Sequence, residues 1–402
     1  MQDAAALLAG LRWDHEGEQR LRSLDAGNWD TLWSLIRTGE GQPLLARRLR
    51  MAGLEAPTEI AARLRRYALA VARRSLAGRA VLSSALGATG RPILLLKGVD
   101  LAERLYGNVG ARSMSDIDFL VRQGDIPAFD AYFRSHGYAP TPPPHEVLVR
   151  SRRHHHALYC HPDPRRLPLE LHWRLANDAR YGSIDIAGIW ARAQPHPGLP
   201  GALVMAPDDL FLYLCLHLKQ HGFDTPLTQI WDLAEMLHAP SLPLDWPTIW
   251  QRAADWHLTR SVELALFLVR SVLGVPTAGI SDWTPDAELA RHLPDVLAQL
   301  GCHPTSDRVT GPRLPMLLSS HSSWLERLGA LRDAALPPRE EIRALHGQPG
   351  DGLWGDCLSY LRGWHHLLRL RGPAVRTSLI GTPAVRAHIE RVSALRRHLD
   401  AG

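Results

Sequence analysis

The sequence has few cysteines, almost no lysine and no long apolar run. Its four cysteines lie far apart and show no paired spacing, which argues against a zinc ribbon or a disulfide framework and is typical of a reducing compartment. No apolar run approaches the roughly 18 to 20 residues of a membrane span, and the N-terminus lacks the basic lead-in of a signal peptide. We therefore expect a cytoplasmic protein with no membrane segment.

The charge balance is mildly basic. Among 402 residues, 46 are Lys or Arg and 41 are Asp or Glu, a net charge of +5. This balance is compatible with an anionic ligand such as a nucleotide or a nucleic acid. Lysine occurs only at Lys97 and Lys219, so these two positions stand out as candidate binding residues.

The hydrophobic pattern changes twice along the chain, which predicts an α+β fold in three parts. Residues 1–88 and 201–402 have the three- and four-residue spacing of helices, whereas residues 89–200 alternate short apolar runs with helical segments. We expect strands within 91–98, 115–121, 154–160 and 166–173, and helices over 99–107 and 125–138. The segment PHPGLP, residues 195–200, is expected to be the linker that ends the middle part.

The stretch RSMSDIDFLV places two carboxylates in an apolar strand. Side chains alternate along a strand, so Ile117 and Phe119 face one way while Asp116 and Asp118 face the other. A buried pair of like charges is costly unless a cation compensates it. The pattern therefore predicts a cation site, although paired aspartates at a strand end are often only a turn or a cap.

A third carboxylate lies on another alternating strand, RLPLELHWR. Its leucines share one face, and Glu170 shares the other face with His172. Three acids on neighbouring strands would form an oxygen cage suited to Mg²⁺. An edge-strand Glu170 facing solvent, with His172 as a structural histidine, would give the same pattern, so this alternative stays open.

The segment Lys97-Gly98 lies where a strand runs into a helix, a position that favours phosphate binding. Gly98 would permit close approach of the backbone, and Lys97 would add a positive charge. Arg112 offers a forked donor to phosphate oxygens.

These motifs resemble those of the polymerase-β-like nucleotidyltransferase superfamily, in particular its uncharacterised bacterial branch related to abortive-infection nucleotidyltransferases. The resemblance rests on Lys97-Gly98, R-x-x-x-D-x-D and ELHW, and extends loosely over 207–276. It implies that Asp116, Asp118 and Glu170 are catalytic and bind two Mg²⁺ ions, with Mn²⁺ as an alternative. The usual Gly-Ser at the helix start is Lys-Gly here, a departure that affects the expected phosphate contacts. The nucleotide-binding residues expected on this basis are Lys97, Gly98, Arg112, Ser115, His172, His217, Lys219, His221 and Asp232.

The remaining histidines allow other readings. His154, His155 and His156 are consecutive, so on a strand they cannot all face one metal. His217 and His221 have the i, i+4 spacing of a zinc pair, but the glutamate that a zinc hydrolase needs after the first histidine is missing. A polar helix face lining the nucleotide cleft, with Lys219 and Asp232 nearby, is favoured. Asp232 could instead simply pair with a local arginine.

We therefore expect a nucleotidyltransferase that transfers a nucleoside monophosphate from an NTP to an acceptor, releasing pyrophosphate. The acceptor would be a small molecule, a peptide or a protein, and Glu170 could also accept its proton. Two alternatives remain: a toxin-like enzyme acting on RNA, and a non-catalytic nucleotide-binding scaffold. The arginine-rich tail after residue 350 would fit RNA, but a solvated helix face would have the same composition.

Overall fold

The computed structural model describes residues 9–38, 41–151, 154–177, 184–223 and 226–278 almost continuously. Beyond these it describes 280–287, 290, 336, 338–346, 354–365, 395 and 399. Of the arginines expected to form a basic tail, Arg362 lies in a described helical segment and those from Arg369 onward lie outside the described residues. None of the described helices is long and apolar enough to cross a membrane.

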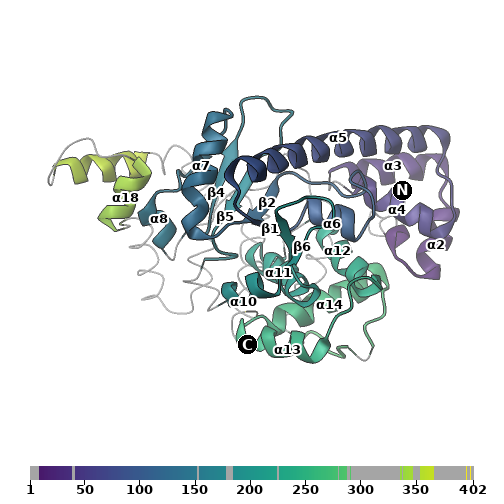
Figure 1. Ribbon diagram of the computed structural model, residues 1–402. Helices are drawn as coiled ribbons and strands as arrows, with labels where there is room; N and C mark the ends of the chain where they lie inside the picture. Colours follow the sequence, from purple (N-terminus) through teal and green to yellow (C-terminus); the bar gives the residue numbers. More distant parts are fainter. Residues whose placement is uncertain are drawn as a thin grey trace.

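The N-terminal part is helical, as predicted. Asp14 caps the first α-helix by accepting the Gly17 N–H, and Gly90 ends the longest helix with a left-handed backbone. That longest helix, α5, runs from the N-terminal helices to the strands (Figure 1). The elements are η1 (Ala9–Leu11), α2 (His15–Arg22), α3 (Ala26–Thr38), α4 (Gln42–Ala52) and α5 (Thr58–Thr89).

The middle of the chain forms a seven-stranded mixed sheet in the order β3-β4-β5-β2-β1-β7-β6. The central strand β2 pairs parallel with β5 and antiparallel with β1. The strands are β1 (Ile93–Leu95), β2 (Ile117–Leu120), β3 (Ala139–Thr141), β4 (His156–Cys160), β5 (Leu169–His172), β6 (Gln194–Pro195) and β7 (Ala202–Val204). The helical elements among them are α6 (Val99–Arg104), η2 (Gln123–Asp125), α7 (Ile126–Ser135), α8 (Glu146–Arg150) and α10 (Ile186–Arg192).

The α+β prediction is confirmed, but the predicted linker is wrong. Residues 195–200 connect β6 to β7, and β7 pairs parallel with β1. The sheet therefore continues past residue 200. Proline and glycine in PHPGLP form a turn between two short strands, which has the same composition as a linker.

Helices resume after the sheet as α11 (Pro207–Gln220), α12 (Leu227–His238), α13 (Trp246–Asp255) and α14 (Thr259–Leu273), with α18 (Arg339–His346) further on. Proline at the start of α11 and α13 fits a position where its missing N–H costs nothing. Helices α11 to α14 share one hydrophobic core with the N-terminal helices, and Leu44, Leu233 and Leu268 all belong to it. The two helical regions are therefore one packed unit.

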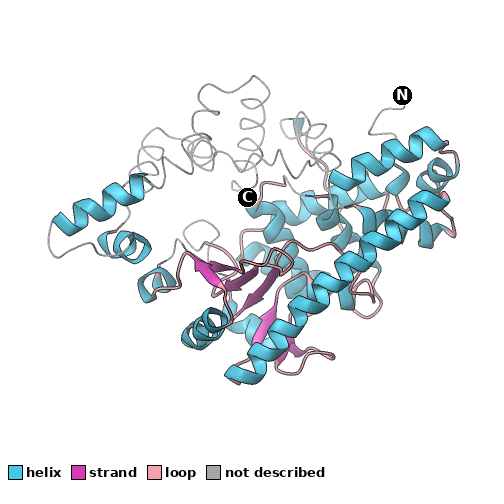
Figure 2. Cartoon of the chain, turned by 90° about the horizontal axis from the view of Figure 1, so that it is seen from above, coloured by secondary structure: helices cyan, strands magenta, loops and turns pink. Residues whose placement is uncertain are grey.

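The two faces of the sheet contribute to different cores. Ile117 and Phe119 of β2 pack with Leu82 of α5 and Phe129 of α7, and Figure 2 shows the long helix passing beside the strands. Leu120, on the opposite face, belongs to the core that contains α11 and α12. Asp118 alternates with Ile117 and Phe119, so its carboxylate lies on the α11–α12 side of the sheet.

Candidate active site

The three predicted carboxylates lie at one place on the sheet. In the parallel pair of β2 and β5, Asp118 is directly opposite Glu170, and Leu120 is opposite His172. Opposite residues of neighbouring strands share a face. The prediction that the strand of Glu170 lies beside that of Asp116 and Asp118 is thus confirmed, and Glu170 is not on a sheet edge.

Asp118 is almost completely buried, with 1% of its surface exposed. Its Oδ1 lies 3.3 Å from Lys97 Nζ and 3.4 Å from His172 Nε2. Its Oδ2 is also buried and has no hydrogen-bond partner among the described residues. Half of this carboxylate is therefore left without a compensating donor.

The imidazole of His172 lies between two of the acids, Glu170 on β5 and Asp118 on β2. Its Nε2 lies 3.2 Å from Glu170 Oε2 as well as near Asp118. Burial lowers the pKa of His172, but hydrogen bonds and charges from Asp118 and Glu170 outweigh it and raise that pKa to about 9. Burial likewise raises the pKa of Glu170, yet the hydrogen bond and charge of His172 lower it to about 2. The geometry thus favours a charged Glu170–His172 pair.

Asp116 is the acid that the site accommodates least well. Burial, and next the charge of Asp118, raise its pKa above the usual value, and the charge of Lys97 only partly opposes them. For Lys97, burial favours the neutral amine, but the charges of Asp118, Asp116 and Glu170 outweigh burial and raise the pKa. Ionised Asp116, Asp118 and Glu170 thus face two protein cations, Lys97 and His172.

Lys97 is held from its other side by helix α11. Its Nζ lies 2.9 Å from His217 Nε2, and His217 Nδ1 lies 3.1 Å from Gln229 Oε1. Burial, followed by the charge of Lys97, lowers the pKa of His217 well below its usual value. A neutral His217 therefore donates from Nδ1 to Gln229 and accepts from Lys97 at Nε2. Both ring nitrogens are engaged, which removes His217 from the zinc pair considered above.

Arg112 and Asp232 form a buried bidentate ion pair. Arg112 Nη2 donates to Asp232 Oδ2 over 2.7 Å, and Nε donates to the same carboxylate over 2.9 and 3.0 Å. Tyr106 Oη donates to Asp232 Oδ1. Burial opposes the charge of Arg112, but Asp232 keeps its pKa above the usual value. Asp232 thus pairs with an arginine, but not with a local one as the alternative reading had it, because Arg112 is 120 residues away in the sequence. The guanidinium is engaged with protein.

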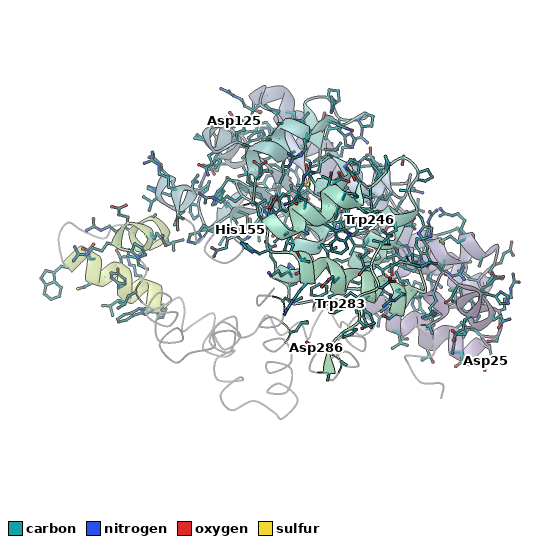
Figure 3. The ribbon with its side chains drawn as sticks, turned by 90° about the horizontal axis from the view of Figure 1, so that it is seen from below. Asp25, Asp125, His155, Trp246, Trp283 and Asp286 are labelled. Atoms are coloured by element: carbon teal, nitrogen blue, oxygen red, sulfur yellow. The ribbon has the colours of Figure 1, made fainter. Side chains whose placement is uncertain are left out.

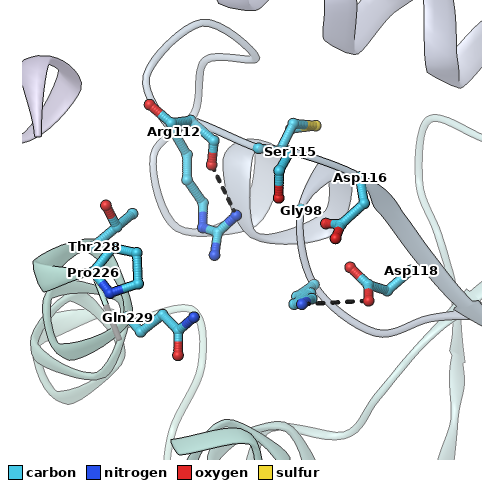
Figure 4. A pocket seen from close by; sticks show the side chains of 11 residues that line it. Gly98, Arg112, Ser115, Asp116, Asp118, Pro226, Thr228 and Gln229 are labelled. Atoms are coloured by element: carbon cyan, nitrogen blue, oxygen red, sulfur yellow. Dashed lines mark hydrogen bonds and ion pairs between the residues drawn. The ribbon is translucent and has the colours of Figure 1, made fainter. Parts of the chain in front are cut away.

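A pocket opens in front of the acids (Figure 4), with Asp116 and Asp118 on one side and Thr228 and Gln229 on the other. Gly98 has φ of 67° and ψ of −104°, a backbone that residues with a Cβ rarely adopt, and this confirms the need for glycine there. The exposed Ser115 also faces the pocket. Its lining comprises Lys97, Gly98, Arg112, Ser113, Met114, Ser115, Asp116, Asp118, Pro226, Thr228 and Gln229.

Sequence reasoning missed the start of α12. Gln229 precedes Asp232 by three residues, and residues three apart share a helix face. That spacing could have identified Gln229 once Asp232 was a candidate. Thr228 and Pro226 carry no comparable signal in the sequence.

Six of the predicted residues do not line the pocket: Glu170, His172, His217, Lys219, His221 and Asp232. Glu170, His172, His217 and Asp232 are the pairing partners described above, which leaves Lys219 and His221. Lys219 is buried, and its Nζ donates to the backbone carbonyls of His257 and Leu399. It lies two residues from His217, and side chains two apart on a helix do not face each other. The exposed His221 stacks beside His217 with ring centroids 4.5 Å apart, but it does not line the pocket.

Asp118, Glu170 and His172 offer ligand atoms that lie within 4.8 Å of one another, close enough to hold one metal ion. The two carboxylates, with an Asp118 oxygen that has no partner among the described residues, suit a divalent cation, and His172 would join them as a ligand only after losing its proton. The pocket is thus a cluster of strand carboxylates beside a lysine, at the boundary between a mixed sheet and a helical unit.

A family model described as "Uncharacterised nucleotidyltransferase" matches residues 25–274, more than half of the chain. The protein belongs to this nucleotidyltransferase family and is a transferase. The matched segment runs from the N-terminal helices to the end of α14 and includes every residue of the pocket. No curated protein and no solved structure matches the chain.

Proposed function

We propose that the pocket binds an NTP with Mg²⁺, or alternatively Mn²⁺, and transfers its nucleoside monophosphate to an acceptor hydroxyl with release of pyrophosphate. The observation that carries the proposal is the undercompensated carboxylate cluster. Asp118 Oδ2 is buried without a partner, and Asp116 has a raised pKa. A site that needs further positive charge is suited to a substrate that arrives with divalent cations.

Asp116, Asp118 and Glu170 would hold the cations. When bound, these cations would neutralise charge on the phosphoryl oxygens and favour loss of the acceptor proton. The acceptor oxygen would bond to the α-phosphorus, and the bond from that phosphorus to the pyrophosphate oxygen would break. The chain's own contribution is to orient the two groups and exclude water.

Lys97 would bind the phosphate tail. Its ammonium lies at the floor of the pocket between Asp118 and His217, and Gly98 beside it leaves the backbone unobstructed. Ser115 on the rim supplies a hydroxyl. Phosphate contacts of this kind strengthen both the bound ground state and the transition state.

Glu170 is better suited to hold a cation than to accept a proton. Its hydrogen bond to His172 and the low pKa that results make it a weak base. We therefore assign it a ligand role and do not assign it the acceptor's proton.

Arg112 is proposed to position the pocket wall. Its ion pair with Asp232 ties the loop that carries Ser113 and Ser115 to α12. This links the acid side of the pocket to the side formed by Thr228 and Gln229.

The test is incubation with Mg²⁺ and each α-labelled NTP, with small-molecule, peptide and RNA acceptors, followed by assay of pyrophosphate and labelled product. We expect stoichiometric pyrophosphate and product, both absent in Asp116→Asn. Lys97→Ala should weaken NTP binding in calorimetry more than it slows the saturated reaction, because its contacts act in the ground state as well. Product confined to RNA would favour the toxin-like alternative. NTP binding without turnover on any acceptor would favour the scaffold and contradict the proposal.

A further inference from the structure

Three histidines converge behind the carboxylates. His156 on β4 is directly opposite His172 on β5 in the antiparallel register, and their ring centroids are 5.1 Å apart. The ring of His155 lies 4.3 Å from that of His156 and 5.9 Å from that of His172. One nitrogen from each ring lies within 4.8 Å of the other two.

The sequence argument that consecutive histidines face opposite ways does not apply to this pair. Strand β4 begins at His156, so His155 lies just before it and is free of strict alternation. The His155 carbonyl nevertheless accepts the Trp173 N–H, which holds this segment beside β5. His155 lies at the edge of the main body that faces α18 (Figure 3). His155 and His156 are both half-buried, and neither lines the nucleotide pocket.

We propose that His155, His156 and His172 form a second metal site, which takes a borderline divalent transition-metal ion such as Zn²⁺. Three imidazoles are the donor set that zinc accepts in open sites with a remaining position for water. His172 is 5% exposed, and its Nδ1 is buried with no hydrogen-bond partner in the part of the chain that the structure describes. A ligand role for Nδ1 would account for this buried nitrogen, because the rings of His155 and His156 lie beside that of His172.

The proposed site would share His172 with the carboxylate cluster. Binding at Nδ1 replaces a proton there and leaves the Nε2–H to donate to Glu170 and Asp118, 3.2 and 3.4 Å away. A metal-bound histidine that donates its other N–H to a carboxylate is a recurrent arrangement that fixes the ring. The transition-metal ion would thus lock the orientation of His172 toward the acids that we assign to Mg²⁺.

This inference does not depend on nucleotidyl transfer, because the site can be titrated with a metal salt alone. The full chain, stripped with a chelator, would be titrated with Co²⁺ and followed by visible absorption, and with Zn²⁺ by calorimetry. We expect one strong site per chain with a spectrum of nitrogen ligation. His155→Gln and His156→Gln should each weaken binding by about tenfold or more, as loss of even an outer contact does.

Two matched controls separate this site from the others. His136→Gln, at the exposed end of α7, should bind Co²⁺ as the wild type does. Asp116→Asn should also retain Co²⁺ binding while it loses nucleotidyl transfer. Circular dichroism would confirm the fold of each variant, and a Zn²⁺-induced rise in melting temperature would provide a second readout.

The inference is overturned by any of three results. These are no binding in the wild type, binding that survives both His155→Gln and His156→Gln, and binding lost in Asp116→Asn or His221→Gln. Loss in Asp116→Asn would place the ion among the carboxylates. Loss in His221→Gln would place it on α11.

Discussion

Two buried aspartates in this protein are compensated very differently. Asp209 on α11 has no exposed surface, and both of its oxygens accept guanidinium N–H bonds, from Arg192 over 2.8 and 3.1 Å and from Arg252 over 2.9 Å. Asp118 is equally buried, but one of its oxygens faces Lys97 and His172 at longer distance, while the other has no partner among the residues that the structure describes. In the helical unit, two arginines neutralise Asp209. In the sheet, the positive charge of the protein compensates Asp118 only in part, which leaves room for another cation.

The contrast separates a structural charge from a functional one. A buried charge that is fully paired stabilises the arrangement of the elements it joins, here α10, α11 and α13. A buried charge that is partly paired costs free energy in the unliganded protein. Such a cost can be retained where a ligand removes it, and we therefore propose that Asp118, rather than Asp209, belongs to the functional site.

The largest expected effect is on turnover in Asp118→Asn. The change removes one charge and keeps the side-chain shape, so nucleotidyl transfer should fall by about 10²–10³-fold or more. Folding should persist, because the amide can still accept from Lys97. Initial rates of pyrophosphate release at saturating NTP would measure the effect. If Asp118→Asn retains the wild-type rate, Asp118 is a structural charge like Asp209 and not a functional one.

Asp209→Asn should show the opposite behaviour, with a large loss of stability. The amide has no charge and keeps one acceptor oxygen, so its NH2 would face a guanidinium donor, and removing one partner of a buried ion pair costs about 3–5 kcal/mol. Arg192 and Arg252 keep 32% and 23% of their side-chain surface exposed, so solvent screening should reduce the loss to about 2–3 kcal/mol. Urea unfolding would measure it. Comparable stability of Asp209→Asn and wild type would show that the guanidinium clamp contributes little.

Glu170→Gln tests the third acid. NTP should bind with nearly unchanged affinity, because Lys97 and the remaining carboxylates are retained, while transfer falls by about a hundredfold. The matched comparison is Glu235→Gln, a buried acid of α12 that is paired with Arg47. That variant should lose stability and keep the turnover number of its folded fraction. Equal rates for Glu170→Gln and wild type would reduce the site to two carboxylates.

The smallest expected effect is on the pH dependence of stability. The folded-state pKa of His172 is about 9 against 6.5 for the free side chain. Its stabilising contribution is therefore complete below about pH 6.5 and is lost as the pH rises toward 9. Melting temperatures of the metal-free wild type should fall over this range by more than those of His172→Gln. If the melting temperatures of the two proteins fall equally with pH, His172 is not positively charged in the folded protein.

The sequence predicted the features that depend on local patterns. Alternation placed Asp118 and Glu170 on the inner face of their strands, and the register of β2 and β5 confirms that they are neighbours. The helices before and after the sheet followed from apolar periodicity. Gly98 followed from the phosphate-loop pattern, and its positive φ agrees.

What the sequence could not predict depends on contacts between distant segments. Arg112 and Asp232 are 120 residues apart, and nothing local distinguishes an arginine that binds phosphate from one that pairs with an acid. The same holds for Lys219, whose ammonium reaches backbone carbonyls of other segments. The convergence of His155 and His156 depended on the residue at which β4 begins, and strand ends are poorly defined by composition.

Helix α5 bears on how small a working fragment of this protein can be. A Cβ at Gly110 would lie 2.7 Å from the Ala68 carbonyl oxygen, and Tyr67 Oη lies 3.1 Å from Ser113 Oγ. The loop that precedes Asp116 therefore packs closely against helix α5, which comes before the first strand in the sequence. A fragment that begins at β1 would contain every proposed ligand of Mg²⁺. It would lack helix α5, against which the loop before Asp116 packs. We therefore expect a working fragment to need residues 58–89.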